Sequence, residues 1–384
     1  MDILLLTPLL FGFMLLLLFL GLPIVFALGG SAVILGLITQ GPSSLLLATT
    51  AILNNIRTIV LIAVPLFIFM GNLLKVSGLA EDLYSAAEKW IGGVRGGLAV
   101  GTVLICTIFA ACTGVSGAAT VTLGLIAVPS MLKRGYDRKL ALGCVMGGGA
   151  LGQLIPPSLL FILYGFLANE SVGRLFASGF VPGLILSGLF IAYILLACHL
   201  KGSLGPATPL EDRGNWKEKV ASLRSIIMPS LLIVAVLGSI FSGLATPTEA
   251  AAVGALGALV ILVINGRLTW PNLKEALYGT FSLTAMVMWI VVGATVFTTI
   301  FTIAGGSELV KSLLLEITIA PIWIVVVMQF LFYIRGITPP EIPTTDIYRS
   351  ALAFVGVQAT ALILVLLFPQ LALWLPNLLF GAEK

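Results

Sequence analysis

A run of small and hydroxyl-bearing residues lies in the middle of a long uncharged stretch. Within the uncharged segment 96–132, residues 109–120 read FAACTGVSGAAT. Glycines and hydroxyls at this depth of an apolar run predict a helix that breaks and restarts, which frees carbonyl groups at one half-end and N–H groups at the other. Carbonyl and hydroxyl oxygens suit a hard cation such as Na⁺, and the N–H end suits a carboxylate. The predicted site comprises Thr113, Gly114, Ser116 and Gly117, with close helix packing through small residues as the alternative.

A second break is predicted shortly afterwards, where residues 147–158 read GGGALGQLIPPS. Pro156 and Pro157 have no N–H group, so they leave carbonyls unpaired one turn upstream. Gln153, Ser158, a water molecule or an ion could satisfy those carbonyls. We therefore add Gly152, Pro156, Pro157 and Ser158 to the predicted ion- and solute-binding residues, with a simple kinked helix as the alternative.

Two further polar features adjoin apolar runs. Asn72 lies near the end of the run 64–74, and its amide is either a ligand of the site or one half of an interhelical hydrogen bond. The sequence Thr246-Pro-Thr-Glu249 has the pattern of a capping box, with Thr at the N-cap, Pro at the first helical position and Glu two residues later. We interpret it as a helix start, with a coupling role for an intramembrane Glu249 as the alternative.

The composition of the chain places these features in a membrane. The 384 residues are 59% hydrophobic and 9% charged, whereas soluble domains have roughly 25% charged residues. A single histidine, His199, and a net charge of +4 argue against a His-based metal site, a Ser-His-Asp triad and nucleic-acid binding. A bilayer core needs about 20 apolar residues per helix, so we predict an all-α polytopic membrane protein. Uncharged runs of this length or more lie at 96–132, 140–169, 175–200, 225–248 and 277–307.

Basic residues gather in two places and predict the orientation. One cluster lies within residues 133–139, and the other lies within residues 201–224, which also contain several glycines and prolines. By the positive-inside rule both clusters are cytoplasmic, and two crossings within residues 140–200 return the chain to the same side. Residues 201–224 are therefore predicted to be a cytoplasmic linker between a first membrane half, 1–200, and a second, 225–384.

The two predicted halves resemble each other, as duplicated halves do in many secondary transporters. The matches are Gly21 with Gly243, Pro23 with Pro247 and Gly78 with Gly305 at offsets of 222 to 227, and then Tyr164 with Tyr333 at an offset of only 169. The offset falls by 58 residues, enough for about two crossings at roughly 20 residues each plus turns. We predict a re-entrant hairpin near 109–128 and a broken helix near 147–164 in the first half, and neither in the shortened second half.

Four segments carry a family pattern. They are VPLFIFMGN at 64–72, MLKRGYD at 131–137, GQLIPPS at 152–158 with ILYG at 162–165, and ATPTEAAA at 245–252. Together they resemble the large membrane subunit of TRAP (tripartite ATP-independent periplasmic) transporters, the DctM type. The resemblance extends from about Gly21 to Phe380, with one gap.

The resemblance implies a function and a set of partners. It implies two inverted halves, an elevator movement, and import driven by Na⁺ as coupling ion, without an enzymatic activity or a cofactor. Thr113, Gly114, Ser116 and Gly117 fall in the hairpin tip that is expected to hold the ion and face the solute. The implied partners are a small membrane subunit, a periplasmic binding protein that delivers a carboxylate solute, and the lipid of the bacterial inner (cytoplasmic) membrane, which the protein crosses several times.

One departure from the family leaves two other readings open. The family's second half has its own hairpin and proline-broken helix, whereas here Phe330 runs almost directly into residues 331–336. The chain is then either a transporter subunit or a truncated, non-transporting paralogue that serves assembly. An intramembrane enzyme is the least favoured reading, because converging acids, a His cluster and a metal motif are absent from the sequence.

Overall fold

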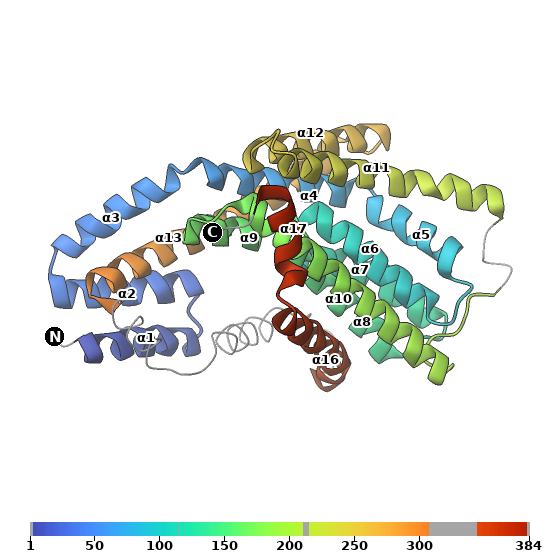
Figure 1. Ribbon diagram of the computed structural model, residues 1–384, viewed down its shortest axis with the longest axis horizontal. Helices are drawn as coiled ribbons and strands as arrows, with labels where there is room; N and C mark the ends of the chain where they lie inside the picture. The colour runs from blue at the N-terminus through green and yellow to red at the C-terminus, as the bar shows by residue number, and fades with distance from the viewer. Residues whose placement is uncertain (1–2, 115, 210–214, 307–343, 382–384) are drawn as a thin grey trace. The chain divides into compact units, whose positions relative to one another are not determined.

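The computed structural model describes residues 3–114, 116–209, 215–306 and 344–381. Within these ranges, the side chains of residues 3–7, 116, 118 and 344–351 are outside the description. The regular elements of the described ranges are all helices (Figure 1). By contact they form two compact units, residues 1–61 with 281–325 and residues 62–280 with 326–384. Each unit therefore draws on both sequence halves instead of corresponding to one of them.

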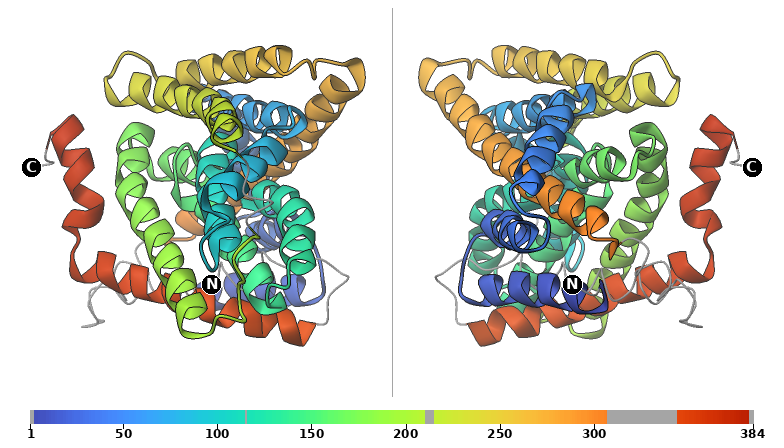
Figure 2. Two further views of the ribbon diagram at one scale, coloured as in Figure 1. Left: turned by 90° about the vertical axis from the view of Figure 1, so that its right-hand side faces the viewer. Right: turned by 90° about the vertical axis from the view of Figure 1, so that its left-hand side faces the viewer.

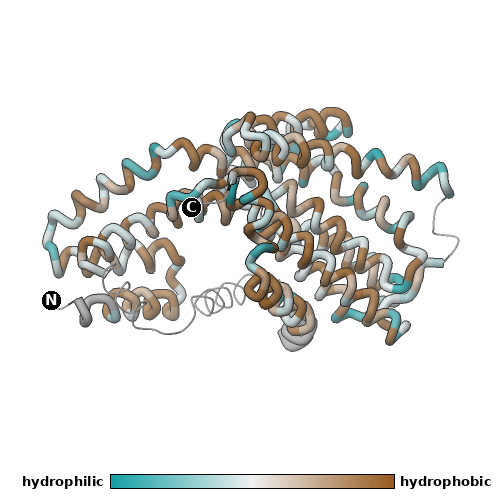
Figure 3. The backbone as a smooth tube through the Cα atoms, viewed as in Figure 1, coloured by the Kyte–Doolittle hydropathy of each residue, from teal (hydrophilic) through white to brown (hydrophobic). Residues whose placement is uncertain are grey.

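Several helices are long and apolar enough to cross a membrane. Within the described ranges there are six such stretches, Ile59–Val76, Arg138–Ala168, Val172–Leu200, Trp216–Phe241, Pro247–Ile264 and Trp270–Ile303. Figure 3 shows hydrophobic residues along the lengths of these helices, while hydrophilic residues gather at places such as the start of Trp216–Phe241. The predicted all-α polytopic membrane protein is thus confirmed.

The first unit is built from α1 (Ile3–Phe19), α2 (Ile24–Gln40), α3 (Ser43–Ile56) and the C-terminal part of α13 (Trp270–Ile303). Small residues let these helices approach closely, since a Cβ built on Gly29 would lie 3.6 Å from the Cα of Gly293. Phe11 packs edge-on against Phe297, with ring centroids 5.4 Å apart. The Asn55 amide donates a hydrogen bond of 2.9 Å to the Thr295 hydroxyl, which satisfies two polar groups within the apolar packing. The buried core comprises Leu10, Ala32, Ala48, Val296, Phe297 and Ile300.

The second unit contains the segments that were predicted to bind an ion and a solute. Its helices are α4 (Ala63–Val76), α5 (Leu79–Ile91), α6 (Gly97–Thr113), α7 (Ser116–Lys133), α8 (Arg138–Leu154), α9 (Leu159–Ala168), α10 (Val172–Leu200), α11 (Trp216–Phe241), α12 (Pro247–Ile264), the start of α13, α16 (Thr344–Leu367) and α17 (Gln370–Phe380). Helix α8 is buried along almost its whole length and packs against α6, α7, α10 and α16 (Figure 2). Its glycines explain this, because a Cβ on Gly148 would lie 2.7 Å from the side chain of Cys106.

Helices α6 and α7 form a hairpin whose tip is near Gly114. Helix α8 packs against both arms, with Gly148 next to Cys106 of α6 and Gly149 next to Thr120 of α7. The hairpin is larger than the predicted span 109–128, because its arms begin at Gly97 and end at Lys133. Seventeen residues in α6 correspond to about 26 Å. The arms are therefore longer than the half-membrane helices that the sequence suggested.

The predicted linker 201–224 is shorter than expected and is partly packed. Helix α11 begins at Trp216, so residues 216–224 are helical. The Asn215 side chain accepts the Trp216 N–H, and the Trp90 ring N–H of α5 donates to the Lys219 carbonyl at 3.0 Å. The preceding loop is tied to two turns by backbone hydrogen bonds, from Gly96 N–H to Gly205 carbonyl and from Asp137 N–H to Leu204 carbonyl (2.8 and 2.9 Å). The second bond places the two predicted basic clusters side by side.

Turn glycines recur at matching positions of the proposed sequence repeat. Gly21 and Gly243 have φ values of 85° and 72°, and Gly78 and Gly305 have values of 76° and 81°. A φ in this range is adopted readily only by glycine, so its recurrence reflects equivalent turns. Gly41 and Gly266, with φ values of 71° and 64°, form a further matching pair that the sequence comparison did not include. The predicted shortening falls around Phe330 and Tyr333, which lie outside the described residues.

Candidate functional site

The tip of the α6–α7 hairpin rests directly on the proline break that follows α8. Gly114 ends α6 with φ 62°, and its N–H bonds the Ala110 carbonyl at 2.9 Å. Its own carbonyl accepts a hydrogen bond of 3.3 Å from the Leu159 N–H, at the start of α9. A Cβ built on Gly114 would lie 2.5 Å from the Pro157 carbonyl oxygen. Two motifs about 40 residues apart in sequence therefore form one junction, which only a glycine at the tip permits.

The break itself is closed by a serine. Helix α8 ends at Leu154, the Pro156–Pro157 peptide bond is cis, and α9 begins after Ser158. Pro157 has no N–H to donate to the Gln153 carbonyl. The Ser158 hydroxyl donates to that carbonyl instead, at 2.7 Å. The hydroxyl proton is used in this bond. The oxygen of the fully buried Ser158 side chain can still accept a hydrogen bond or bind a cation through its lone pairs.

Four helix ends consequently meet at this junction. The C-terminal ends of α6 and α8 bring carbonyl groups, and the N-terminal ends of α7 and α9 bring N–H groups. No side chain caps the N-terminus of α9, where Ser158 is the N-cap residue. The partial charges at helix ends make the first pair suitable for a cation and the second suitable for an anion.

Helix α4 packs against the hairpin tip through Gly71. A Cβ built on Gly71 would lie 2.9 Å from the Thr113 Cα and 3.2 Å from its Cβ. The Thr113 hydroxyl donates to the Phe109 carbonyl at 3.0 Å, and its side chain is buried. The close approach explains why a glycine sits within an otherwise apolar helix, because any side chain would push α4 away from the tip.

Asn72, the neighbour of Gly71, points to a different partner. Its amide nitrogen donates a hydrogen bond of 3.1 Å to the Thr280 hydroxyl of α13. A Cβ on Gly279 would lie 3.0 Å from the Asn72 amide oxygen, so both ends of the amide face α13. Lys75 and Glu275, one turn further along the same pair of helices, form an ion pair of 3.1 Å. The interhelical hydrogen bond, which the sequence left as the alternative for Asn72, is thus present.

The remaining predicted residues occupy different positions at the junction. Gly152 is buried in the last turn of α8, and Pro156 cannot donate to its carbonyl. Gly117 is exposed in the first turn of α7, with nothing within 4 Å of a built Cβ. Ser116 begins α7, but its side chain lies outside the described residues. The structure therefore brings together Thr113, Gly114, Pro157 and Ser158, and does not place the Ser116 hydroxyl.

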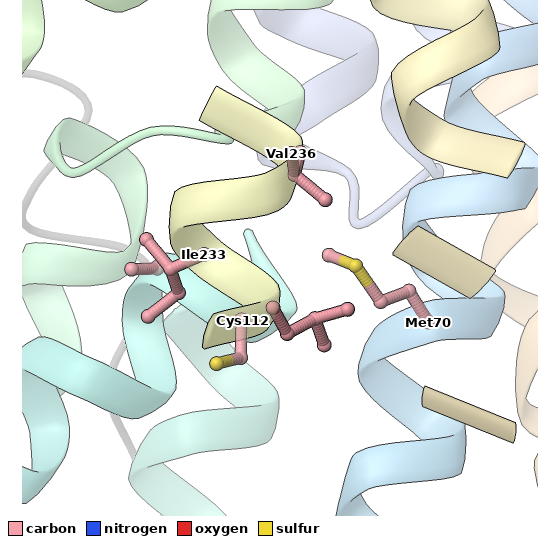
Figure 4. Close-up of a pocket in the computed structure, with 6 residues that line it drawn as sticks. Met70, Cys112, Ile233 and Val236 are labelled. Atoms are coloured by element: carbon pink, nitrogen blue, oxygen red, sulfur yellow. The ribbon is translucent and has the colours of Figure 1, made fainter. Parts of the chain in front are cut away.

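A small apolar gap adjoins the contact between α4 and α6. Figure 4 shows Met70, Cys112, Ile233 and Val236 around it, and Ala111 and Leu232 complete its lining. The gap has no room for a water molecule. Apolar side chains therefore fill the space where α4, α6 and α11 come together.

The polar start of α12 is a structural cap. The Glu249 carboxylate accepts the Thr246 N–H at 2.8 Å, and the Thr246 hydroxyl accepts the Glu249 N–H at 3.3 Å. The predicted capping box is confirmed, and the carboxylate of Glu249 is engaged in it. Across the described residues, no group of three His, Cys, Asp or Glu side chains could hold a metal ion. A cation at the junction would therefore rely on carbonyl and hydroxyl oxygens.

Three contributors to the junction were not identified from the sequence. They are the Gly71 close approach, the Pro157 carbonyl, and the Leu159 N–H. A glycine inside the apolar helix 63–76 was a usable signal for the first. The backbone groups have no signal of their own, because any residue supplies them.

The arrangement has the features of a class of membrane protein. Broken membrane helices whose half-helix ends converge inside the protein are the construction of secondary transporters. The comparison with known proteins agrees with this class. Residues 11–340 match the family described as "Tripartite ATP-independent periplasmic transporter, DctM component", and the chain belongs to that family of TRAP transporter permeases.

Named TRAP transporter permeases are similar over much of the chain. The C4-dicarboxylate TRAP transporter large permease protein DctM of Vibrio cholerae is 28% identical over 94% of this chain and 96% of that protein. The protein of the same name from Pseudomonas aeruginosa is 35% identical over 72% of this chain and 64% of its own length. The ectoine/5-hydroxyectoine permease UehC of Ruegeria pomeroyi is 31% identical, over 73% of this chain and 65% of UehC. The chain thus spans slightly less than two thirds of these last two relatives.

The alignment with the Vibrio cholerae permease also bears on length. It extends over 439 positions but includes only 94% of this chain, which is about 361 of its 384 residues. That relative therefore has about 78 residues without a counterpart here.

Proposed function

We propose that this chain is the membrane-embedded permease of a secondary transporter that imports a carboxylate-type solute coupled to Na⁺. The observation that carries the proposal is the hydrogen bond from the Leu159 N–H to the Gly114 carbonyl. It joins the hairpin tip to the proline break, so that helix ends of both kinds converge at one place in the protein. Membership of the DctM family supports a transport role.

The helix ends divide the binding task by charge. Na⁺ takes hard oxygen ligands. The ends of α6, at Thr113, and of α8 provide carbonyl oxygens, and Ser158 adds its hydroxyl oxygen. The N–H groups that open α7 and α9 provide the electropositive end for a solute carboxylate. Gly117 is exposed beside them, where a solute could approach the backbone. We leave Asn72 out of this proposed set, because its amide nitrogen donates to Thr280 of α13.

The proposed setting follows from the family. The chain works in the bacterial inner membrane with a small membrane subunit and a periplasmic binding protein that delivers the solute. Relatives are named for C4-dicarboxylate and for ectoine, and both compounds bear a carboxylate. An elevator movement would carry the junction of α6, α7, α8 and α9 across the membrane as one packed body, since α8 is buried and packs against both hairpin arms.

A second function is favoured by one observation. The Vibrio cholerae permease has about 78 residues without a counterpart in this chain. The offset of the sequence repeat falls by 58 residues in the second half, which is where we propose that most of this difference lies. A permease that lacks the second hairpin and broken helix would keep one half of a symmetric site. The second candidate is therefore a non-transporting subunit that assembles with the other components.

Reconstitution separates the two functions. The chain would be incorporated into proteoliposomes with its small subunit and binding protein, and uptake of radiolabelled succinate and ectoine would be measured with and without a Na⁺ gradient. Na⁺-dependent uptake supports the permease. Absence of uptake, combined with uptake by a version that carries the missing stretch of the Vibrio cholerae relative, would establish the assembly subunit instead.

A further inference from the structure

A polar cavity lies away from the hairpin junction, between α5, α11 and α12. Its volume is about 230 Å³, which is ample for ordered water or a small polar group. Four polar side chains and four apolar ones line it: Asp82, Arg224, Ser225 and Asn265, with Leu79, Met228, Ile261 and Ile264. The cavity therefore has both a charged mouth and an apolar wall.

The cavity lies at the depth of lipid headgroups. Helix α12 is apolar from Pro247 to Ile264 and has the length of one membrane crossing, so Asn265 directly follows its membrane-spanning part. Arg224 lies nine residues inside α11, a helix of 26 residues that is longer than the roughly 20 needed to span the hydrocarbon core. The side chain of an arginine at this position reaches the interface. Basic residues gather on this side, which makes it cytoplasmic by the positive-inside rule.

The polar lining offers groups of both signs. The Arg224 guanidinium can donate two hydrogen bonds to one phosphate, and the Ser225 hydroxyl can add a third. Asp82 supplies a carboxylate on the opposing helix α5. The Asn265 amide is already anchored, since it donates to the Ser77 carbonyl at 3.2 Å. This anchor fixes the end of α12 against the start of α5.

Asp82 is a partly desolvated carboxyl group with charged neighbours of both signs. Burial raises the pKa of its carboxyl group above the ordinary value of 3.8, the neighbouring Glu81 raises it further, and Arg267 lowers it. A cationic group bound in the cavity would stabilise the ionised form of Asp82.

We propose that this cavity binds the phosphoethanolamine headgroup of a membrane phospholipid. The phosphate lies against Arg224 and Ser225, and the ammonium group lies against Asp82. The acyl chains leave along Met228, Ile261 and Ile264. An anionic headgroup such as phosphoglycerol satisfies Arg224 equally well but provides no cation for Asp82, so the zwitterionic lipid is preferred.

The test measures lipid binding to the purified full chain by native mass spectrometry, with phosphatidylethanolamine and phosphatidylglycerol titrated separately. We expect the wild-type protein to bind phosphatidylethanolamine more tightly. Arg224→Gln removes a charged hydrogen bond and should weaken binding of both lipids roughly tenfold. Asp82→Asn should weaken binding of phosphatidylethanolamine alone and so abolish the preference. Lys217→Gln is the matched control, because Lys217 is a cation of the same helix outside the cavity lining.

Other outcomes would overturn the proposal. Equal affinity of the wild-type chain for both lipids, or an Arg224→Gln effect no larger than that of Lys217→Gln, would show that the headgroup is not recognised here. Soluble phosphoethanolamine that binds as tightly as the lipid would make the free compound the ligand. Loss of the bound lipid when the small subunit is added would assign the cavity to a protein interface. Folding of each variant is checked by circular dichroism.

Discussion

The backbone N–H of Leu159 donates a hydrogen bond of 3.3 Å to the carbonyl of Gly114. This bond links the first residue of α9 to the tip of the α6–α7 hairpin. Neither group belongs to a chemically distinctive side chain, yet their contact brings both proposed binding segments into one place. Interference with the junction therefore tests the proposed function most directly.

Replacing Gly114 by Ala should separate the hairpin tip from the break. The residue has φ 62°, and a Cβ would lie 2.5 Å from the Pro157 carbonyl oxygen. Left-handed backbone strain costs about 1 kcal/mol or more for a residue with a Cβ, and the clash adds to it. We expect a lower thermal midpoint and loss of Na⁺-dependent uptake. Gly188→Ala on α10, where a Cβ meets nothing within 4 Å, should leave both unchanged; similar losses in the two variants would contradict the steric argument.

Ser158→Ala should destabilise the break and weaken Na⁺ dependence together. Without the hydroxyl, the Gln153 carbonyl loses the donor that now lies 2.7 Å away, at a cost of about 0.5–1.5 kcal/mol. The proposed cation also loses an oxygen ligand. Ser158→Thr retains a hydroxyl and should restore most of the Na⁺ affinity, measured as the Na⁺ concentration for half-maximal uptake. Normal Na⁺ affinity in the alanine variant would remove Ser158 from the ion site.

Gly71→Ala should move α4 away from the hairpin tip. The added Cβ would lie 2.9 Å from the Thr113 Cα, and backbone cannot rotate away. Such overpacking costs about 1–3 kcal/mol. Gly254→Ala provides the comparison, because its Cβ would meet the flexible Met70 thioether at 2.6 Å. Thermal unfolding in detergent should show the larger loss for Gly71→Ala, and equal losses would argue against a rigid contact there.

Asn72 and Thr280 should behave as a structural pair. Their hydrogen bond predicts a coupling energy of about 0.6 kcal/mol, and at most about 1.7, in a double-mutant cycle built from Asn72→Leu and Thr280→Val. Because the amide is engaged with α13, neither variant should alter the Na⁺ concentration for half-maximal uptake. A change in Na⁺ affinity for Asn72→Leu with Thr280→Val unaffected would return Asn72 to the ion-binding residues.

Lipid preference should depend on pH through Asp82. The ionised carboxylate favours the ammonium headgroup, so the preference for phosphatidylethanolamine is complete well above the raised pKa of Asp82 and declines as the pH falls through it. Glu81 on the same helix raises this pKa, and Arg267 lowers it. Arg224 lines the cavity from α11 and is the other charged side chain of its lining. The preference of Asp82→Asn should be absent at every pH; a pH-dependent preference in this variant would assign the titration to another group.

Local chemistry made part of this protein predictable from its sequence. Long apolar runs require helices in a bilayer, so the all-α membrane fold follows from composition. Breaks near Gly114 and at Pro156–Pro157 were predicted from residue types that favour helix ends, although Pro129 and Pro182 lie inside helices of the same protein. The capping box from Thr246 to Glu249 spans four residues, and the structure has it as predicted. Each of these features depends on neighbours in sequence alone.

Contacts between distant segments were decided only by the tertiary structure. The docking of Gly114 on Pro157 and the pairing of Asn72 with Thr280, which are 208 residues apart, depend on which helices pack together. Many glycines and polar side chains in this sequence could have made equivalent contacts, so residue type alone does not select among them. The same packing turned residues 216–224 from a predicted linker into helix. Sequence therefore determined where the helices break, and long-range packing determined that the breaks meet.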